Sequence, residues 1–311
     1  MLSIEEKKYW IWLSRLPKVG NKTIEKLIEK YHFPDVIYNL SKKELMSNDR
    51  IGEKIADIIL SKKYRIDLEK YISYMNKENI NIITIMDKEY PKKLKKIEDC
   101  PMYLYTKGNI ELLNKKSIAI VGSRNCTSYG KEVAQIMAKQ LVSNNIIVVS
   151  GLAKGIDTFS HLGAINYYSS TIAVLGCGID RIYPNENRRL AQNILQKNGL
   201  IISEYVMGTK PERLNFPARN RIISGISDGV LVVEATNKSG ALITVDFAIE
   251  QGKDVFAIPG NINSIFSNGT NQILKEGAKL TNNVMDILEE EATEDIEMMA
   301  AITPTDQPYM K

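Results

Sequence analysis

The sequence has little of what several functional classes need. Its three cysteines, Cys100, Cys126 and Cys177, lie far apart and form no C-x-x-C pair, which argues against a disulfide framework and against a zinc site. Only two histidines are present, His32 and His161, so histidine-based catalysis or metal binding has few resources. We therefore expect no metal ion.

Long apolar runs are also missing. No run approaches the roughly 20 residues that a membrane-spanning helix needs, and the first ten residues, MLSIEEKKYW, contain acids where a secretory signal would be apolar. These features predict a cytoplasmic protein with no membrane partner. The motif G-x-x-x-x-G-K-[ST] is absent as well, which excludes a P-loop ATPase.

Charge is unevenly distributed along the chain. The net charge is +4, but from Asp286 onward there are eight acids and one base, so this end carries −7 and the remainder +11. A basic body favours an anionic partner, although solvation of the surface explains the charge almost as well. Residues 289–311 have little apolar periodicity and are predicted to be a disordered acidic tail.

Residues 1–65 have the apolar spacing of short helices and predict a small all-helical domain. Two turns, residues 16–23 and 50–54, combine an apolar residue with glycine and precede lysine-bearing helices. They resemble the turns of SAM and helix-hairpin-helix domains, whose backbone amides can hold a nucleic-acid phosphate. Lys18 stands where the first glycine of that motif usually lies, and a plain connector explains either turn equally well.

From about residue 100, apolar runs alternate with amphipathic helices. The runs lie at 117–122, 146–151, 171–176, 200–205, 229–235 and 254–260, with helices expected at 129–143, 155–167, 187–197, 218–226 and 241–251. The runs are apolar on both faces, as in a parallel sheet covered by helices. The sequence thus predicts an α/β domain over 66–288 with a doubly wound, mostly parallel sheet. Residues 66–100 would join it to the helical domain and add an edge strand at 81–87.

Ligands of such a sheet bind beyond the carboxyl ends of its strands, and five of these ends carry glycine or small residues beside a cation. Glycine lets a backbone approach closely, and cations neutralise phosphate. Repetition along one edge favours a chain of phosphates, with Tyr183 and Phe216 available to stack on bases. The predicted DNA-binding residues are Gly122, Ser123, Arg124, Ser150, Gly151, Lys154, Gly155, Gly176, Gly178, Arg181, Tyr183, Asn185, Arg188, Phe216, Arg219, Asn220, Arg221, Ser239, Gly240 and Thr244.

Two simpler explanations stay open for individual members of this set. Glycine at a strand-to-helix turn often serves turn geometry alone, and Arg219 and Arg221 can be solvated. Catalytic patterns are scarcer: Asp157, Glu204 and Glu234 lie near strand ends, but no Ser-His-Asp, Cys-His or paired-carboxylate spacing is evident. We therefore expect no catalytic residue and no cofactor.

Several long motifs together resemble the DprA/Smf family of DNA-processing proteins. They are AIVGSR (119–124), SGLAKGID (150–157), AVLGCGIDRIYPNEN (173–187), SEY (203–205), FPARNRIISGISDGVLVVEA (216–235), SGALIT (239–244) and DVFAIPGN (254–261). The resemblance covers about 100–288 densely and the helical part more loosely. It implies an extended Rossmann-like domain with additional strands around 81–87 and 103–105. The family's Gly-Ser-x-Arg-type DNA-binding turn corresponds to Gly122, Ser123 and Arg124.

The resemblance also implies a function. Members bind single-stranded DNA cooperatively as homodimers, protect incoming DNA and load the RecA recombinase during natural transformation, the competence pathway. The dimer forms around the element NQILKEGAKL, residues 271–280, which points to Ile273, Leu274 and Leu280, although core burial explains each equally well. Many members carry a carboxy-terminal winged-helix domain; only 23 residues follow Leu288, so we expect none here.

One enzymatic alternative belongs to a related fold. Phosphoribohydrolases that act on nucleoside monophosphates share a Pro-Gly-Gly-x-Gly-Thr loop, and the corresponding stretch here, residues 238–244, reads KSGALIT. The diglycine is missing, which favours binding over catalysis. The sequence leaves open whether the role lies in transformation or in general DNA repair.

Overall fold

A computed structural model describes residues 4–65 and 68–289, so the acidic tail predicted for 289–311 lies outside the described residues except for Glu289. The helices that precede the first strand in the described residues are α1 (Ile4–Ser14), α2 (Asn21–Tyr31), α3 (Pro34–Asn39), α4 (Lys42–Met46), α5 (Glu53–Leu60), α6 (Lys62–Arg65) and α7 (Leu68–Lys77). No helix of the described residues is long and apolar enough to cross a membrane.

The remaining elements alternate between strand and helix. They are β1 (Asn81–Thr84), β2 (Tyr103–Gly108), β3 (Ser117–Val121), α8 (Ser128–Ser143), β4 (Ile147–Ser150), α9 (Ile156–Ala164), β5 (Thr171–Val174), α10 (Arg188–Gln196), β6 (Leu200–Ser203), α11 (Asn215–Ile226), β7 (Gly229–Val232), α12 (Ala241–Glu250), β8 (Asp254–Ala257), α13 (Asn268–Lys275) and β9 (Lys279–Leu280). Short 3₁₀ turns η1 (Leu94–Lys96), η2 (Ile110–Asn114), η3 (Asn185–Asn187) and η4 (Ile265–Ser267) complete the described elements.

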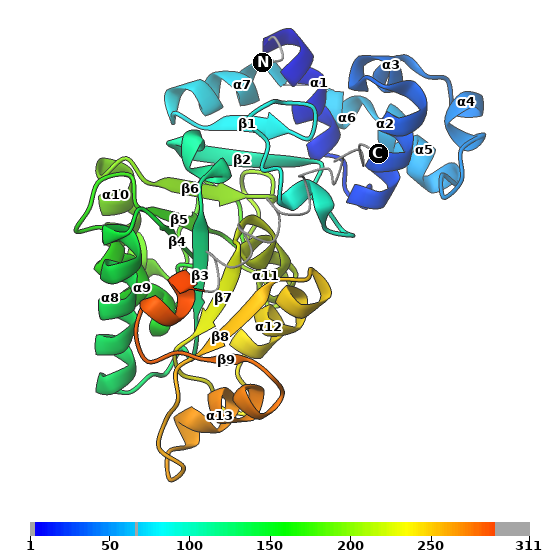
Figure 1. Ribbon diagram of the computed structural model, residues 1–311. Helices are drawn as coiled ribbons and strands as arrows, with labels where there is room; N and C mark the ends of the chain where they lie inside the picture. Colours follow the sequence, from blue (N-terminus) through cyan, green and yellow to red (C-terminus); the bar gives the residue numbers. More distant parts are fainter. Residues whose placement is uncertain (1–3, 66–67, 290–311) are drawn as a thin grey trace, which may run out of the picture.

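One nine-stranded sheet runs through the molecule in the order β1-β2-β6-β5-β4-β3-β7-β8-β9 (Figure 1). Strands β3 to β9 pair in parallel, whereas β1 pairs antiparallel with β2, and β2 antiparallel with β6. The α/β, Rossmann-like, mostly parallel sheet expected from the sequence is confirmed, including the two additional strands.

The chain reverses its direction of winding at the centre of this sheet. It proceeds outward from β3 through β4, β5 and β6, then returns to place β7 on the other side of β3. This topological switch point opens a crevice beyond the carboxyl ends of β3 and β7, where doubly wound sheets usually hold their ligand. The loop after β3, residues 122–127, and the loop after β7, residues 233–240, form its two sides.

Helices cover both faces of the sheet because the strand interiors are apolar on both sides. On one face, Ile120 of β3 packs with Met137 and Leu141 of α8 in a core that also holds Ile156 of α9. On the other face, Val121 packs with Ile222 of α11, in a core that reaches α12 and α13. Alternate residues of β3 therefore supply two separate cores.

The amino-terminal helices lie at the β1-β2-β6 end of the sheet, with α7 beside β1 (Figure 1). Trp10 and Leu13 of α1 share one apolar core with Tyr105 of β2 and Ile201 of β6. The Ser14 and Tyr105 hydroxyls lie 2.6 Å apart within this core. Leu68, Met75 and Ile82, from the segment expected to join the two domains, lie in the same core. The domain boundary at residue 65 stays a prediction.

Both predicted hairpin turns of this helical part adopt the same backbone path. Lys18 and Arg50 have φ of 63° and 66°, and each is followed by a buried apolar residue and then by Gly20 or Gly52 at a helix N-cap. Lys18 therefore adopts, at some cost, the left-handed conformation for which glycine is usual. Phosphate binding by these turns stays a prediction.

Candidate nucleic-acid interface

Three side chains form a cluster at the carboxyl edge of the sheet. Arg124 follows β3 and is exposed; its guanidinium carbon lies 5.4 Å from the centre of the Phe216 ring. The Tyr183 ring lies 5.5 Å from that of Phe216 at an interplanar angle of 43°. Arg124 forms no ion pair with any acid of the described residues, so its charge is open to a ligand. We name these three residues the rim cluster.

Glycine at the end of β5 explains how Phe216 reaches this edge. A Cβ at Gly176 would lie 2.9 Å from the Phe216 ring, so only a residue without a side chain lets the ring rest on the strand end. Helix α11 starts at Asn215 and thereby fixes Phe216 in its first turn. The ring is half-buried, with one part packed on the sheet and another open to solvent.

The loops after β3 and β4 hold each other in place. Gly155 has φ of +76°, and a Cβ there would lie 2.2 Å from the Ser123 carbonyl oxygen. The Ile156 amide donates to that carbonyl at 3.2 Å, and the Ser123 amide donates to the Glu234 carbonyl at 2.7 Å. The predicted glycines and Ser123 therefore shape the turn, and the Ser123 N–H is already used within the protein.

Other predicted residues also lie on this edge with their side chains exposed. Lys154 pairs with Glu186 at 2.5 Å, and Arg181 lies 3.9 Å from Asp180. Asn220 donates to the Gly240 carbonyl at 3.3 Å and so connects the starts of α11 and α12. The exposed or half-exposed residues of the predicted set are Gly122, Arg124, Lys154, Gly155, Arg181, Tyr183, Asn185, Arg188, Phe216, Asn220, Ser239 and Gly240.

Arg219 does not reach the surface. It is 3 % exposed, and one guanidinium nitrogen donates to the carbonyls of Gly151 and Val174, the former at 2.8 Å. Burial lowers the pKa of Arg219 to about 10 and raises that of its neighbour Asp157, which accepts from the Gly151 amide at 3.1 Å. Arg219 thus supports two strand ends, neither solvated nor facing a ligand.

Arg221 is buried as well, in an ion-paired junction. Its guanidinium contacts Glu204 at 2.6 Å and Asp99 at 3.1 Å. Burial raises the pKa of Glu204, with Arg221 opposing the shift. The junction joins α11, the end of β6 and the segment before β2, so Arg221 cannot reach a phosphate at the rim.

Several smaller predicted residues are internal too. Ser150 donates to the Ile120 carbonyl at 2.7 Å, and Thr244 lies buried within α12. A Cβ at Gly151 would lie 2.5 Å from the Arg219 guanidinium, and one at Gly178 2.6 Å from the Asp180 carboxylate. These residues shape the edge from below. They were predicted to contact DNA, but each is buried and supports the residues of the edge instead.

Two exposed residues that precede Phe216 were not among the DNA-binding residues predicted from the sequence. Arg213 and Leu214 lie just before α11, and Leu214 is 82 % exposed. The signal was present in the run KPERLNF (210–216), which places cations beside an aromatic residue. Such interleaving is typical of surfaces that bind single strands.

The structure offers little for metal or histidine chemistry at this edge. No group of three His, Cys, Asp or Glu side chains suited to a metal ion occurs in residues 4–65 and 68–289. His161 is fully buried, its Nδ1 lies 2.8 Å from the Thr171 hydroxyl, and burial lowers its pKa to about 3. His161 is thus a neutral packing residue.

Comparisons with known proteins agree on one family. Residues 81–292 match the family model described as DNA recombination-mediator protein A. The DNA processing protein DprA of Streptococcus pneumoniae is 43 % identical over 243 residues, which cover 76 % of this chain and 85 % of that protein. DprA of Bacillus subtilis is 43 % identical over 224 residues, covering 72 % and 75 %.

Solved structures show the same relationship in three dimensions. The X-ray structure of DprA from S. pneumoniae is 37 % identical with a TM-score of 0.73 and covers 91 % of this chain and 97 % of that one. A Helicobacter pylori DprA structure, whose subject is a single-stranded DNA binding mode, is 33 % identical with a TM-score of 0.62. It covers 69 % of this chain and 97 % of that one.

Proposed function

The chain belongs to the DprA/Smf family of DNA-processing proteins, and from this premise we propose that it binds single-stranded DNA along the carboxyl edge of its sheet. In this proposal the bound protein protects incoming DNA and presents it to the RecA recombinase. The Helicobacter pylori relative, described as a single-stranded DNA binder, supports the first of these steps.

The rim cluster carries the proposal. Arg124 supplies a charge without an acidic partner, and its guanidinium can form two parallel hydrogen bonds with a phosphate. Phe216 and Tyr183 offer ring faces on which unpaired bases can stack, and every base has such a face. A duplex hides those faces, so we expect single strands to bind more tightly than duplex of equal length, with weak sequence preference.

The decisive experiment is Arg124→Ala, measured by binding to an oligonucleotide at several salt concentrations. Loss of one phosphate contact should weaken binding to every sequence and make the negative slope of log K against log salt shallower by roughly 0.7. Lys139→Ala is the matched control, because Lys139 is exposed towards the far end of α8. An alanine variant with unchanged affinity and slope would remove Arg124 from the interface.

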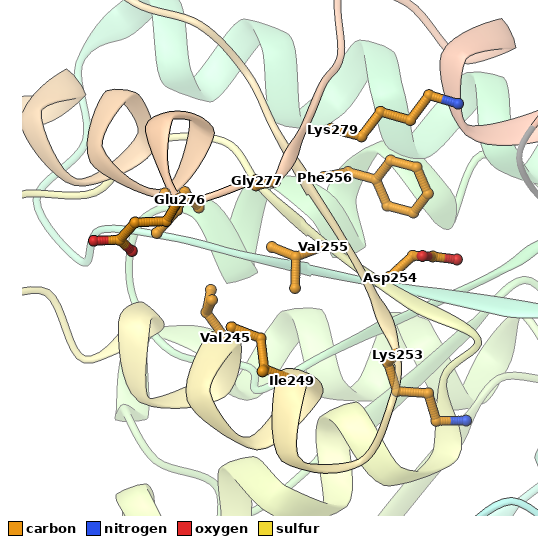
Figure 2. Close-up of a pocket in the computed structure, with 11 residues that line it drawn as sticks. Val245, Ile249, Lys253, Asp254, Val255, Phe256, Glu276, Gly277 and Lys279 are labelled. Atoms are coloured by element: carbon orange, nitrogen blue, oxygen red, sulfur yellow. The ribbon is translucent and has the colours of Figure 1, made fainter.

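A homodimer through the β9 end of the sheet is also part of the proposal. Ile273 lies in the core of its own chain and Leu274 is half-buried, but Leu280 of β9 is 50 % exposed. A hollow of about 340 Å³ lies beside β9, where Val245 and Ile249 of α12 approach Val255 of β8 (Figure 2). The charged residues Lys253, Asp254, Glu276 and Lys279 also line it. An exposed edge strand beside a hollow with both apolar and charged lining residues suits a two-fold pairing with a second copy.

Leu280→Glu tests this dimer because it places a charge on the edge strand without disturbing the core. We expect it to elute as a monomer in size-exclusion chromatography with light scattering. Met46→Glu, on the exposed side of α4, should elute like the unmodified chain. A Leu280→Glu protein that is folded and dimeric would place the interface elsewhere.

The RecA step and the enzymatic alternative have separate tests. If the chain loads RecA, it should shorten the lag before RecA assembles on single strands already coated with a single-strand-binding protein. If it is a phosphoribohydrolase instead, incubation with nucleoside monophosphates should release free base. We expect the first result and no released base.

A further inference from the structure

The crevice at the switch point is occupied by a side chain of the protein itself. Glu234 follows β7 and is 3 % exposed. Its carboxylate accepts from the Thr127 amide at 2.8 Å and from the Thr127 hydroxyl at 2.5 Å. Thr127 is the N-cap of α8 and in turn accepts from the Gly130 amide at 3.1 Å. The carboxylate is thus connected to the amino end of a sixteen-residue helix.

The backbone has been shaped around this carboxylate. A Cβ at Gly130 would lie 2.3 Å from one Glu234 carboxylate oxygen, so the first turn of α8 admits the group only because that residue is glycine. On the other side, the Glu234 carbonyl accepts from the Ser123 amide at 2.7 Å. Glu234 therefore closes the junction between β3 and β7 with both its side chain and its backbone.

In doubly wound sheets this same position, at the amino end of the helix after the first strand, holds the phosphate of a nucleotide. An anion at that point is stabilised by the helix amides and dipole. Here the anion is Glu234, and a second one so close would meet like-charge repulsion. Space for a small molecule remains beside it, since a cavity of about 530 Å³ is lined by Thr127, Tyr129, Glu234, Asn261, Ser264 and Ser267.

We propose that Glu234 is a specificity residue, an internal anion that denies the nucleotide crevice to free phosphates and nucleotides. Phosphate recognition is left to the outer rim, where Arg124, in the same loop as Thr127, is exposed and forms no ion pair with an acid of the described residues. This inference concerns ligands that the chain rejects. It does not rest on DNA binding and can succeed or fail independently of that function.

Glu234→Ala tests the proposal, with inorganic phosphate and adenosine monophosphate as probes. Removal of the carboxylate leaves the Thr127 amide and hydroxyl without their acceptor, so the variant should gain binding to both probes. At a ligand concentration about tenfold above the dissociation constant, its melting temperature should rise by roughly 3 °C. The unmodified protein should not respond at matched ionic strength, and titration calorimetry should show heat only for the variant.

Thr127→Ala is the matched control, because it also removes hydrogen bonds of this junction but keeps the carboxylate. It should be destabilised and remain without response to phosphate. A response from Thr127→Ala or from the unmodified chain would overturn the proposal, as would a folded Glu234→Ala protein that ignores both probes. If Glu234→Ala is unfolded in chloride, folding restored by phosphate supports the proposal, and failure to fold in either salt overturns it.

Discussion

Arginines at two depths of the same sheet edge have opposite surroundings. Arg124 is exposed, touches an aromatic ring and has no acidic partner among the described residues. Arg219 and Arg221 are buried against carbonyl groups and carboxylates. The residue type is identical, so the difference lies in what burial demands: a charge removed from water must be matched by protein groups, whereas an exposed one stays available to a ligand.

The largest expected effect is a loss in the free energy of unfolding when a buried arginine is replaced. Arg221→Met would leave the Glu204 carboxylate without its main partner, and breaking a buried pair in this way costs about 3–5 kcal/mol in the free energy of unfolding. Arg124→Met should change that quantity by less than about 0.5 kcal/mol, as surface substitutions do. Urea denaturation of both variants compares them. Equal losses in the free energy of unfolding would contradict the distinction between the buried and the exposed arginine.

A smaller change in free energy, in this case of DNA binding, is expected from substitution of Phe216. Phe216→Ala removes a stacking surface and should weaken binding to single-stranded DNA by about 1–3 kcal/mol. Phe216→Leu keeps apolar contact with Gly176 but not the ring face, so it should preserve stability while losing most of that affinity. Fluorescence anisotropy with a labelled oligonucleotide measures the change. If the leucine variant binds normally, stacking is not the contribution of Phe216.

The pH dependence of folded stability tests a third buried side chain, that of His161. His161 has a pKa of about 3 in the folded protein against 6.5 as its ordinary value. The unfolded chain therefore takes up a proton first as pH falls below 6.5, and folded stability is lost across that window. Between pH 7.5 and 5 the loss should be about 2 kcal/mol from this group, and His161→Gln should remove it from the pH profile. A profile unchanged by the substitution would mean that His161 is not buried as described.

The smallest expected effect is that of Arg124→Lys on DNA binding, which separates the contribution of the charge from that of the guanidinium geometry. Arg124→Lys keeps the charge, so the salt dependence of DNA binding should match that of the unmodified protein. Lysine lacks the planar fork and stacks less well on Phe216, so affinity should fall by roughly 0.5–1 kcal/mol. A loss equal to that of alanine would mean that geometry, and not charge, accounts for the contact.

Element order and strand positions were predictable because apolar runs in a parallel sheet are nearly continuous. The strand ends were less predictable. Strand β7 stops at Val232, whereas the apolar run continues to Ala235, because Val233 and Ala235 are also buried in the cores although the Ala235 amide already donates to Phe266, outside the sheet. Helix α11 starts at Asn215, three residues before its expected start, because Pro217 is tolerated in a first turn.

For the site, the sequence grouped the candidates beyond the carboxyl ends of the strands, but it could not show which of them are buried and which are exposed. Arg219 and Arg221 lie two residues apart on one helix, like many solvated pairs, and only the positions of Asp157, Glu204 and Asp99 in space show that both are internal. Glu234 was noted as a carboxylate near a strand end; its contact with Thr127 joins residues 107 apart in the chain. No local pattern encodes such a pairing.

The apolar core shared by α1 and the β1-β2-β6 end of the sheet has a consequence for how the chain can be divided. Trp10, Leu13, Tyr105 and Ile201 belong to one buried cluster, and the Tyr71 hydroxyl accepts from the Met207 amide at 3.0 Å, in the loop that leads to the rim. A polypeptide that starts at β1 would expose Tyr105 to water. Heat should therefore unfold the helical part and the sheet in a single cooperative transition, and amides of α1 should exchange with solvent as slowly as those of β2.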